Sequence, residues 1–220
     1  MAAILITGAG RGIGLALAQH LAARGDRVIA LCRAPSRELE QIEGIRIIGD
    51  IEITDSAAIE RLATQLDKQA LDIVIHNAGL LSDESLNDLN IERIQRQIAV
   101  NAIAPLQLTQ ALLPNLRNGS KVVLISSLMG SIEDNSSGGM YGYRMSKAAL
   151  NMAGKSLSID LKAAGIAVGL FHPGLVATAM TQGQGMSTDQ AADNLIDRID
   201  QLSPASSGQF FRATGEPLPW

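Results

Sequence analysis

Residues 2–14 read AAILITGAGRGIG, an apolar segment that leads directly into a glycine-rich turn. The apolar part (2–7) is typical of a buried strand, and residues 13–25 repeat apolar side chains at helical spacing. Glycines let a backbone turn tightly and approach a phosphate, while a helix start offers free N–H groups and positive dipole. The stretch therefore predicts a strand–turn–helix unit that cradles a phosphate. Taken alone, it is also compatible with a glycine-rich turn that binds no ligand.

Strand-length apolar segments alternate with helical patterns along the rest of the chain. Such alternation predicts a parallel sheet with helices on both faces. We expect a single α/β domain over residues 1–220, a doubly wound Rossmann fold in three layers. A late strand is expected at 208–211, an N-cap at Thr54 or Asp55, and a mobile substrate loop at about 176–190. The strand segments are 2–7, 27–32, 45–50, 71–76, 121–126 and 166–171, and the helical segments are 13–25, 54–66, about 91–116 and about 143–163.

Composition excludes several classes of protein. The 220 residues are 46% apolar and carry a net charge of −4, without a block of basic residues that would suit nucleic acid or an anionic membrane. No apolar run reaches about 18 residues, the length of a membrane-spanning helix. The single Cys32 excludes an internal disulfide, and the three scattered histidines argue against a metal site. The first residues have no basic region, so we expect a strand rather than a signal peptide, and a cytoplasmic protein.

Two arginines distinguish between nicotinamide cofactors. The turn contains Gly8, Gly12 and Gly14 in the spacing G-x-x-x-G-x-G, with Gly10 and Arg11 between them. NAD-preferring sites usually carry an acidic residue at the end of the second strand, where it binds the ribose hydroxyls. Here that strand ends in LCR (31–33), and Arg33 supplies a second guanidinium. Two guanidiniums would attract a 2′-phosphate, so the sequence favours NADP(H). Arg37 either assists them or is a surface residue.

Six motifs follow one another along the chain: TGAGRGIG (7–14), HNAG (76–79), VNA (100–102), ISS (125–127), YRMSK (143–147) and HPGLVAT (172–178). Together they resemble the short-chain dehydrogenase/reductase family, over residue 3 to about residue 180. The segment 126–151 resembles the branch of sniffer-type carbonyl reductases and C-factor-like proteins. In that branch the gap between the family's serine and tyrosine is also longer than usual; here Ser127 lies 16 residues before Tyr143.

The resemblance implies a cofactor site spread over these motifs. It assigns the pyrophosphate to the glycine turn, the adenine to Asp50 with Ile51, and the adenine ribose to the NAG segment. It assigns the nicotinamide to the segment after His172 and the nicotinamide ribose to Lys147. His76 departs from the family's frequent asparagine, and neither it nor His172 is given a chemical role. The implied residues are Gly8, Gly10, Arg11, Gly12, Ile13, Gly14, Arg33, Asp50, Ile51, Asn77, Ala78, Gly79, Tyr143, Lys147, Pro173, Gly174, Val176 and Thr178.

Spacing distinguishes the two tyrosines of YGYRMSK (141–147). Tyr143 lies four residues before Lys147, so a helix places both on one face, whereas Tyr141 has Met145 at that spacing. An unperturbed tyrosine, with a pKa of about 10, is a poor acid at neutral pH. We expect the Lys147 ammonium, with the charge of oxidised nicotinamide, to lower the pKa of Tyr143. Tyr143 is then the general acid or base, and Tyr141 belongs to the pocket wall or to packing.

The resemblance completes the catalytic set and implies the reaction. It selects Ser127 over Ser126 as the partner of the substrate oxygen, and it gives Asn101 a water that links Lys147 to solvent. The expected activity is NADPH-dependent reduction of a ketone or aldehyde, in a homodimer or homotetramer formed through the long helices. The alternative is a C-factor-like signalling or sensor protein that binds nucleotide with little turnover. The substrate is not readable, because Met129, Met140, Met180 and Met186 either line a soft pocket or fill core and loops.

Overall fold

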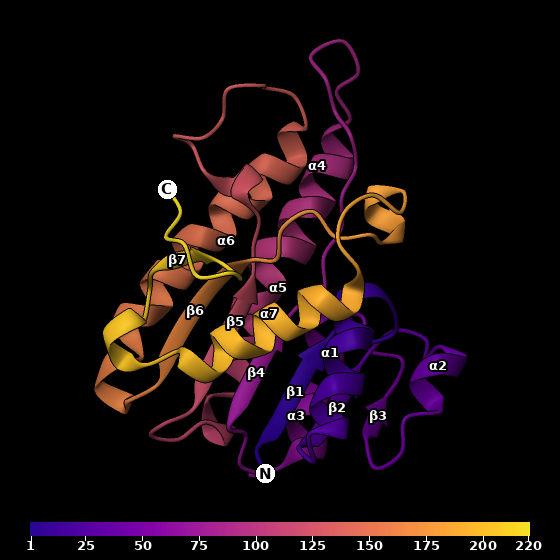
Figure 1. The fold of residues 1–220 in the computed structure, drawn as a ribbon, viewed down its shortest axis with the longest axis vertical. Helices are drawn as coiled ribbons and strands as arrows, with labels where there is room; N and C mark the ends of the chain where they lie inside the picture. The colour runs from indigo at the N-terminus through magenta and orange to yellow at the C-terminus, as the bar shows by residue number, and fades with distance from the viewer.

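The computed structural model describes residues 1–220 and contains one seven-stranded sheet in the order β3-β2-β1-β4-β5-β6-β7 (Figure 1). Every neighbouring pair is parallel. The predicted fold class, a doubly wound parallel sheet, is confirmed. The strands are β1 (Ala3–Thr7), β2 (Arg27–Leu31), β3 (Arg46–Ile48), β4 (Ile73–His76), β5 (Lys121–Ile125), β6 (Ala167–His172) and β7 (Phe210–Arg212).

Helices cover both faces of the sheet. One face is covered by α1 and α7, and the other by α3, α5 and α6, with α4 packed on α6. None of the helices is both long enough and apolar enough to cross a lipid bilayer. The helices are α1 (Gly12–Ala23), α2 (Arg37–Glu40), α3 (Ser56–Leu66), α4 (Ile91–Ile98), α5 (Ala104–Ala111), α6 (Tyr141–Asp160) and α7 (Thr188–Gln201).

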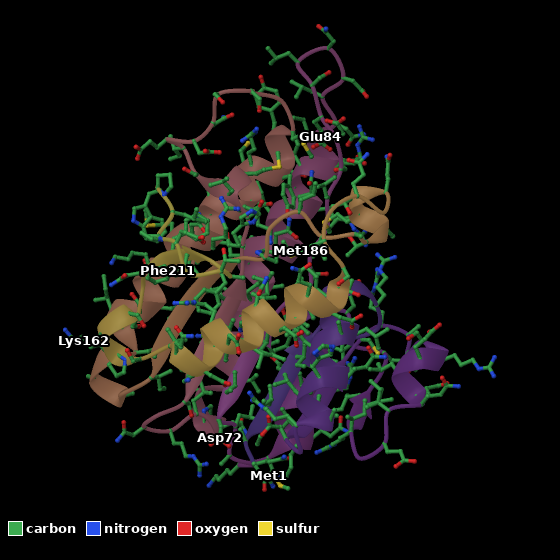
Figure 2. All side chains as sticks on the ribbon, viewed as in Figure 1. Met1, Asp72, Glu84, Lys162, Met186 and Phe211 are labelled. Carbon is green, nitrogen blue, oxygen red and sulfur yellow. The ribbon has the colours of Figure 1, made fainter.

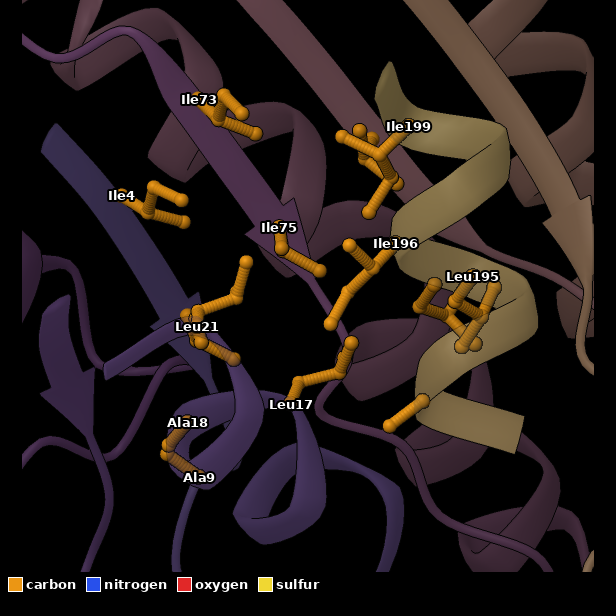
Figure 3. Close-up of a cluster of buried hydrophobic side chains, with 14 of the residues drawn as sticks. Ile4, Ala9, Leu17, Ala18, Leu21, Ile73, Ile75, Leu195, Ile196 and Ile199 are labelled. Atoms are coloured by element: carbon orange, nitrogen blue, oxygen red, sulfur yellow. The ribbon is translucent and has the colours of Figure 1, made fainter. Parts of the chain in front are cut away.

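Alternation along the strands divides the core between the two faces. Ile4 and Ile6 of β1 pack with α1 and α7. Figure 3 shows Ile4 in one cluster with Leu17 of α1 and Ile196 of α7. Leu5, which lies between them in the strand, packs on the opposite face with α3 and α5. Because both faces are buried, the strands need apolar residues at every position, which explains their continuous apolar runs.

Four segments differ from the sequence-based expectations. The piece at 91–116 is divided into α4, a π-helical turn (Ala99–Ile103), α5 and a 3-10 turn (Leu113–Asn115). The sequence reading missed α7, which begins at Thr188 inside the expected loop at 176–190. The remainder of that loop is tied by a bridge between Val176 and Met186. The strands at 45–50 and 208–211 are three residues each.

Helix ends follow local side-chain chemistry. Asp55, rather than Thr54, caps α3, because its carboxylate accepts the N–H of Ala57. Gly165 has a left-handed backbone directly after the turn that follows α6, as the sequence indicated for this helix end.

Candidate functional site

The carboxyl ends of β1, β4, β5 and β6 bring the predicted motifs to one edge of the sheet. Each of these strands is followed by a motif: the glycine turn after Thr7, the NAG segment after His76, the serine pair after Ile125 and the Pro173–Gly174 segment after His172. Because the strands are parallel, these four segments share an edge, which is where open α/β sheets bind ligands. Contacts between the segments show how closely they pack.

The glycine turn packs directly on the NAG segment. The Thr7 hydroxyl accepts the N–H groups of Asn77 and Ala78, both at 3.0 Å. The Asn77 amide donates to the carbonyls of Thr7 (3.1 Å) and Gly8 (3.2 Å). A Cβ added at Gly14 would lie 2.3 Å from the Gly8 carbonyl oxygen and 2.4 Å from Asn77 Nδ2. The turn therefore requires glycine at 14, and its cradle fits the close approach of a pyrophosphate.

The opening of α1 faces the segment that follows β6. Gly12, which has a positive φ of 56°, would bring a Cβ to 3.3 Å from the Thr178 methyl group. Gly10 would bring one to 3.2 Å from the Ala34 carbonyl oxygen, on the other side of the turn. Arg11 is exposed and gives the helix no side-chain cap, and Ile13 is half-buried behind it. The free N–H groups of this helix start are thus open to an anion.

A cation that follows β2 lies beside an acidic residue from the segment that follows β3. The Arg33 side chain is 69% exposed, and its Nη1 lies 3.9 Å from a carboxylate oxygen of Glu52. The Arg33 carbonyl accepts the N–H of Asp50, and the Cys32 carbonyl accepts that of Ile51. Asp50 is exposed with a positive φ of 55°, whereas Ile51 is buried. The structure therefore groups Arg33, Asp50 and Ile51, and adds Glu52, which the sequence reading had not included.

The two serines after β5 have different partners. The Ser126 hydroxyl donates to Asn151 of α6 at 2.6 Å and is buried in that contact. The Ser127 hydroxyl accepts the N–H of Met129 at 3.2 Å and also interacts with the Tyr143 hydroxyl. Ser127, Tyr143 and Lys147 are all buried and lie together, since Lys147 Nζ is 5.7 Å from the centroid of the Tyr143 ring.

Burial, rather than Lys147, dominates the acidity of Tyr143. Burial raises the pKa of Tyr143 above its ordinary value, and the hydrogen bond with Ser127 only partly opposes this. Lys147 alone does not lower this pKa in the structure, so the lowering expected from Lys147 together with the charge of oxidised nicotinamide stays a prediction. The Lys147 ammonium donates instead to the Ile125 carbonyl at 2.8 Å, and burial lowers the pKa of Lys147 to about 8. Desolvation thus favours the neutral form of both groups.

Asn101 lies in the π-helical turn and secures the chain after the NAG segment. Its amide accepts the N–H of Leu80 and donates to the Leu80 carbonyl, both at 2.7 Å, and it also donates to Ser146 of α6. A Cβ added at Gly79 would lie 3.5 Å from Asn101 Oδ1 and 3.9 Å from Lys147 Nζ. Asn101, Gly79 and Lys147 are therefore neighbours, and the Asn101 side chain satisfies backbone groups as well.

The segment after β6 completes the edge. Gly174 has a positive φ of 91°, and a Cβ there would lie 2.9 Å from the terminal methyl of Met186. Pro173 and Val176 are buried, and Thr178 begins a 3-10 turn (Ala179–Thr181) with a capping box. None of the four methionines that the sequence singled out is buried, so they do not fill the core. They either line a pocket or lie in loops: Met129, Met140, Met180 and Met186.

The histidines lie apart from one another. His76 is buried against Thr109 at 2.9 Å, and burial lowers its pKa to about 3. His172 is packed with its Nδ1 unpartnered, and its pKa is lowered to about 4 by burial and by the charges of Arg212 and Lys147. His20 is paired with Asp189 and Asp193 of α7 at the surface. The structure holds no group of His, Cys, Asp and Glu side chains arranged to bind a metal ion.

Other residues contribute to the site without having been identified from the sequence. Thr7 holds the NAG segment, and the buried Glu84 and Gln97 lie against the start of α6. Thr7 directly precedes the glycine turn, so its position was a usable signal. Glu84 and Gln97 fall in segments that look polar and exposed in sequence, and only the packing reveals their burial.

The short chain dehydrogenase family model matches residues 2–188. Together with the parallel sheet and the clustered motifs, this match shows that the chain belongs to the short-chain dehydrogenase/reductase family, a family of oxidoreductases. Within it, the chain falls in the branch that the sequence indicated, with sniffer-type carbonyl reductases and C-factor-like proteins.

Two relatives, each with a specific name, align over most or all of the chain. A 1-hydroxy-2-glutathionyl-2-methyl-3-butene dehydrogenase of Rhodococcus sp. (strain AD45) is 38% identical over 227 residues, covering 100% of both chains. The C-signal protein of Myxococcus xanthus is 42% identical over 164 residues, covering 72% of this chain and 98% of that protein. The chain is thus similar to one protein named as an enzyme and to one named as a signal.

Solved structures extend the similarity to the whole fold. The carbonyl reductase Sniffer of D. melanogaster superposes with a TM-score of 0.92 at 29% identity, covering 100% of both chains. An NADPH-bound carbonyl reductase from chicken fatty liver superposes with a TM-score of 0.91 at 30% identity, covering 100% of this chain and 99% of that one. Both neighbours are named as carbonyl reductases.

Proposed function

We propose that this protein is an NADPH-dependent carbonyl reductase in which Tyr143 protonates the substrate oxygen. The observation that carries the proposal is the buried cluster of Ser127, Tyr143 and Lys147 beside the glycine cradle, at the ligand-binding edge of the sheet. When bound, NADPH supplies the hydride that reduces the carbonyl carbon. The protein must then supply the proton, hold the oxygen and exclude water.

The roles of the three side chains follow from their environments. Burial keeps the Tyr143 hydroxyl protonated, so it is held in the form that a general acid needs for reduction. Ser127, whose hydroxyl already interacts with that of Tyr143, donates a hydrogen bond to the developing alkoxide. Lys147 supplies a positive charge behind Tyr143 and binds the nicotinamide ribose, and Asn101 holds the water that connects Lys147 to solvent.

In this proposal, backbone groups bind the pyrophosphate of the cofactor and arginine side chains bind its 2′-phosphate. Gly8, Gly10, Gly12, Ile13 and Gly14 receive the pyrophosphate at the start of α1, and Arg11 and Arg33 receive the 2′-phosphate. Asp50 and Ile51 hold the adenine and the NAG residues its ribose, while Pro173, Gly174, Val176 and Thr178 hold the nicotinamide. The bound NADPH of the chicken carbonyl reductase supports this choice of cofactor. Glu52 opposes it in part, because it lies beside Arg33.

Substrate choice falls to the loop at 176–187, the part of the expected loop that precedes α7, and to the methionines that it carries. Met180 and Met186 lie on that loop, and Met186 contacts Gly174, so a flexible thioether borders the proposed nicotinamide site. The name of the Rhodococcus relative describes a hydroxylated glutathionyl compound. A secondary or primary alcohol bearing a glutathionyl group therefore belongs in the substrate panel, and oxidation is to be assayed as well as reduction.

Residues 1–220 form one unit in this proposal, acting in the cytoplasm as a homodimer or homotetramer. Exposed apolar side chains on α5 and α6, including Leu106, Met152 and Ile159, support association through those helices. Light scattering coupled to gel filtration measures the mass directly. A monomer at assay concentration would remove this part of the proposal.

The second candidate is a nucleotide-binding signal or sensor protein. It is favoured by the 42% identity to C-signal. The complete set of Ser127, Tyr143 and Lys147 favours the enzyme, because a protein that only binds nucleotide has no need of a buried proton donor. In this second candidate, NADPH binds and the carbonyl panel gives no turnover.

The deciding experiment is a panel of ketones, aldehydes and alcohols assayed by nicotinamide absorbance, with NADPH and NADH in parallel. We expect NADPH oxidation with at least one carbonyl class, with the alcohol product identified by mass spectrometry. Tight NADPH binding without turnover across the whole panel would contradict the reductase proposal and favour the sensor.

A further inference from the structure

Glu84 and Gln97 are fully buried polar side chains that the proposed reaction does not use. Both are 0% exposed. A buried carboxylate is costly unless its oxygens are hydrogen-bonded. The Glu84 carboxylate meets this requirement, since Ser82 donates to Oε1 and Gln97 Nε2 donates to Oε2 at 2.9 Å, with Arg93 Nε 3.5 Å from Oε1. The pair is therefore a satisfied internal contact that the fold maintains.

The pair lies directly against the start of the helix that carries Tyr143. A Cβ added at Gly142 would lie 2.2 Å from Gln97 Nε2 and 2.9 Å from Glu84 Oε2. Gly142 immediately precedes Tyr143 in the chain, and it is buried in this contact. The close approach is possible only because residue 142 has no side chain.

The first turn of α6 has no cap of its own. Its N-cap residue, Met140, has a positive φ of 48° and makes no side-chain capping bond, and the first turn contains no acidic residue. Helix starts without a cap depend on their packing partners for a fixed position. Glu84 places a negative charge beside this helix start, where it is electrostatically favourable.

The segment that holds Glu84 is itself fixed to the site. Asn101 binds both backbone groups of Leu80, and the Ser82 N–H donates to Gln97 Oε1 at 3.0 Å. Figure 2 shows Glu84 beside α4, the helix that contains Gln97. One end of this segment, Leu80, is thus held by Asn101, which lies near Lys147. The other end, Glu84, lies against Gly142.

We propose that Glu84 and Gln97 are positioning residues for Tyr143, which hold the first turn of α6, through Gly142, at the depth that lets the tyrosine hydroxyl meet Ser127. The proposal rests on the carbonyl reductase function proposed above. Neither residue touches substrate or cofactor; they act on the reaction through the placement of one hydroxyl group. Displacement of a catalytic group by about 1 Å can lower a rate by about a hundredfold.

The first test is Glu84→Gln, which preserves the side-chain shape but removes the charge and one hydrogen-bond acceptor. We expect kcat for carbonyl reduction to fall about tenfold, while KM for the carbonyl and the Kd for NADPH stay within about twofold. Asp83→Asn is the matched control, because it removes the same charge from the adjacent, exposed position and leaves kcat unchanged. A folded Glu84→Gln protein with kcat within twofold of wild type, or with NADPH binding lost in step with kcat, would overturn the proposal.

The second test is a rescue that does not depend on the behaviour of Glu84→Gln. Gly142→Ala should lower kcat about tenfold, because its new methyl group meets Gln97, and Gln97→Ala alone should also lower kcat, because it removes the positioning contact. The double variant should exceed Gly142→Ala by at least about threefold, because the smaller side chain at 97 makes room for the methyl group. Additive losses in the double variant would contradict positioning through this contact. If wild-type protein reduces no carbonyl, the proposed function itself fails; if wild type turns over and the rescue is absent, only the positioning role fails.

Discussion

The turn after β1 depends on glycines, which have no side chains. The site at the start of α6 depends instead on side chains that separate segments of the chain bring together. Gly14 leaves room for the Gly8 carbonyl and the Asn77 amide, and the proposed contacts of this turn with a ligand are made by backbone N–H groups. Ser127, Tyr143 and Lys147 are instead buried, and their acidities are set by desolvation. A backbone site can thus be read from local sequence, but the chemistry of a buried side-chain site depends on the packing around it.

The largest expected effect separates the two regions. Tyr143→Phe removes the proposed proton donor and keeps the ring that fills the site, so carbonyl reduction should fall by about a thousandfold or more. NADPH binding, measured by fluorescence titration, should stay within about threefold because the glycine turn is untouched. Tyr141→Phe is the control and should retain most of its activity. Substantial turnover by Tyr143→Phe would remove the role assigned to that hydroxyl.

The second prediction changes the glycine turn after β1 and leaves the buried side chains intact. Gly14→Ala places a methyl group within contact of the Gly8 carbonyl and Asn77, so the turn must open and NADPH should bind about a hundredfold more weakly. At saturating NADPH, the folded variant should recover a larger share of kcat than Tyr143→Phe does. Gly25→Ala is the control for a general loss of stability: its positive φ of 90° strains an alanine, but a Cβ there meets nothing within 4 Å, so NADPH affinity should stay unchanged. Unchanged NADPH affinity in Gly14→Ala would show that the turn does not hold the cofactor.

The pH profile tests the buried charges. Lys147, with its pKa lowered to about 8, keeps its ammonium below that pH and loses it as the pH rises. Tyr143, with its pKa raised, stays protonated over the same range. We expect kcat/KM for reduction to be level below pH 8 and to fall up to about tenfold per pH unit above it. A profile that stays level to pH 10 would mean that the Lys147 charge is not needed.

The smallest effects belong to the exposed cofactor-selecting charges, because solvent screens them. Arg33→Ala should weaken NADPH about tenfold and leave NADH nearly unchanged, while Glu52→Gln should strengthen NADPH about twofold by freeing Arg33. Isothermal titration with both cofactors measures these ratios. Equal losses for NADPH and NADH in Arg33→Ala would reject the 2′-phosphate assignment.

Much of the fold was predictable because its signals are local. The buried strands read as unbroken apolar runs, and Gly165 and Asp55 marked helix ends. The missed helix α7 has apolar residues at helical spacing, including Ala192, Leu195 and Ile199, but the glycine-rich stretch before it concealed the pattern. The interruption at Ala99–Ile103 had a local signal in Pro105, which cannot donate a backbone hydrogen bond to the Asn101 carbonyl, but the π-helical form of the turn was not predicted.

The sequence indicated which of these residues lie together at one edge of the sheet, but it did not indicate their electrostatics. The spacing of Tyr143 and Lys147 selected the tyrosine, and the order of the motifs brought Ser127 beside it. The direction of the Tyr143 pKa could not be read, because desolvation depends on which elements cover the hydroxyl. Glu52 reaches Arg33, and Glu84 reaches Gly142, through contacts between segments that are distant in the chain. Such pairs appear only once the chain is folded.

Transfer of deuterium from NADPH that carries deuterium at both C4 positions is the most direct measurement of the central claim. Wild-type protein and a reducible carbonyl from the panel are incubated with labelled cofactor, and the alcohol is analysed by mass spectrometry. The account predicts an alcohol that carries one deuterium on the former carbonyl carbon, and no detectable alcohol from Tyr143→Phe at equal NADPH occupancy. Unlabelled alcohol, or the same yield of labelled alcohol from Tyr143→Phe, would contradict it.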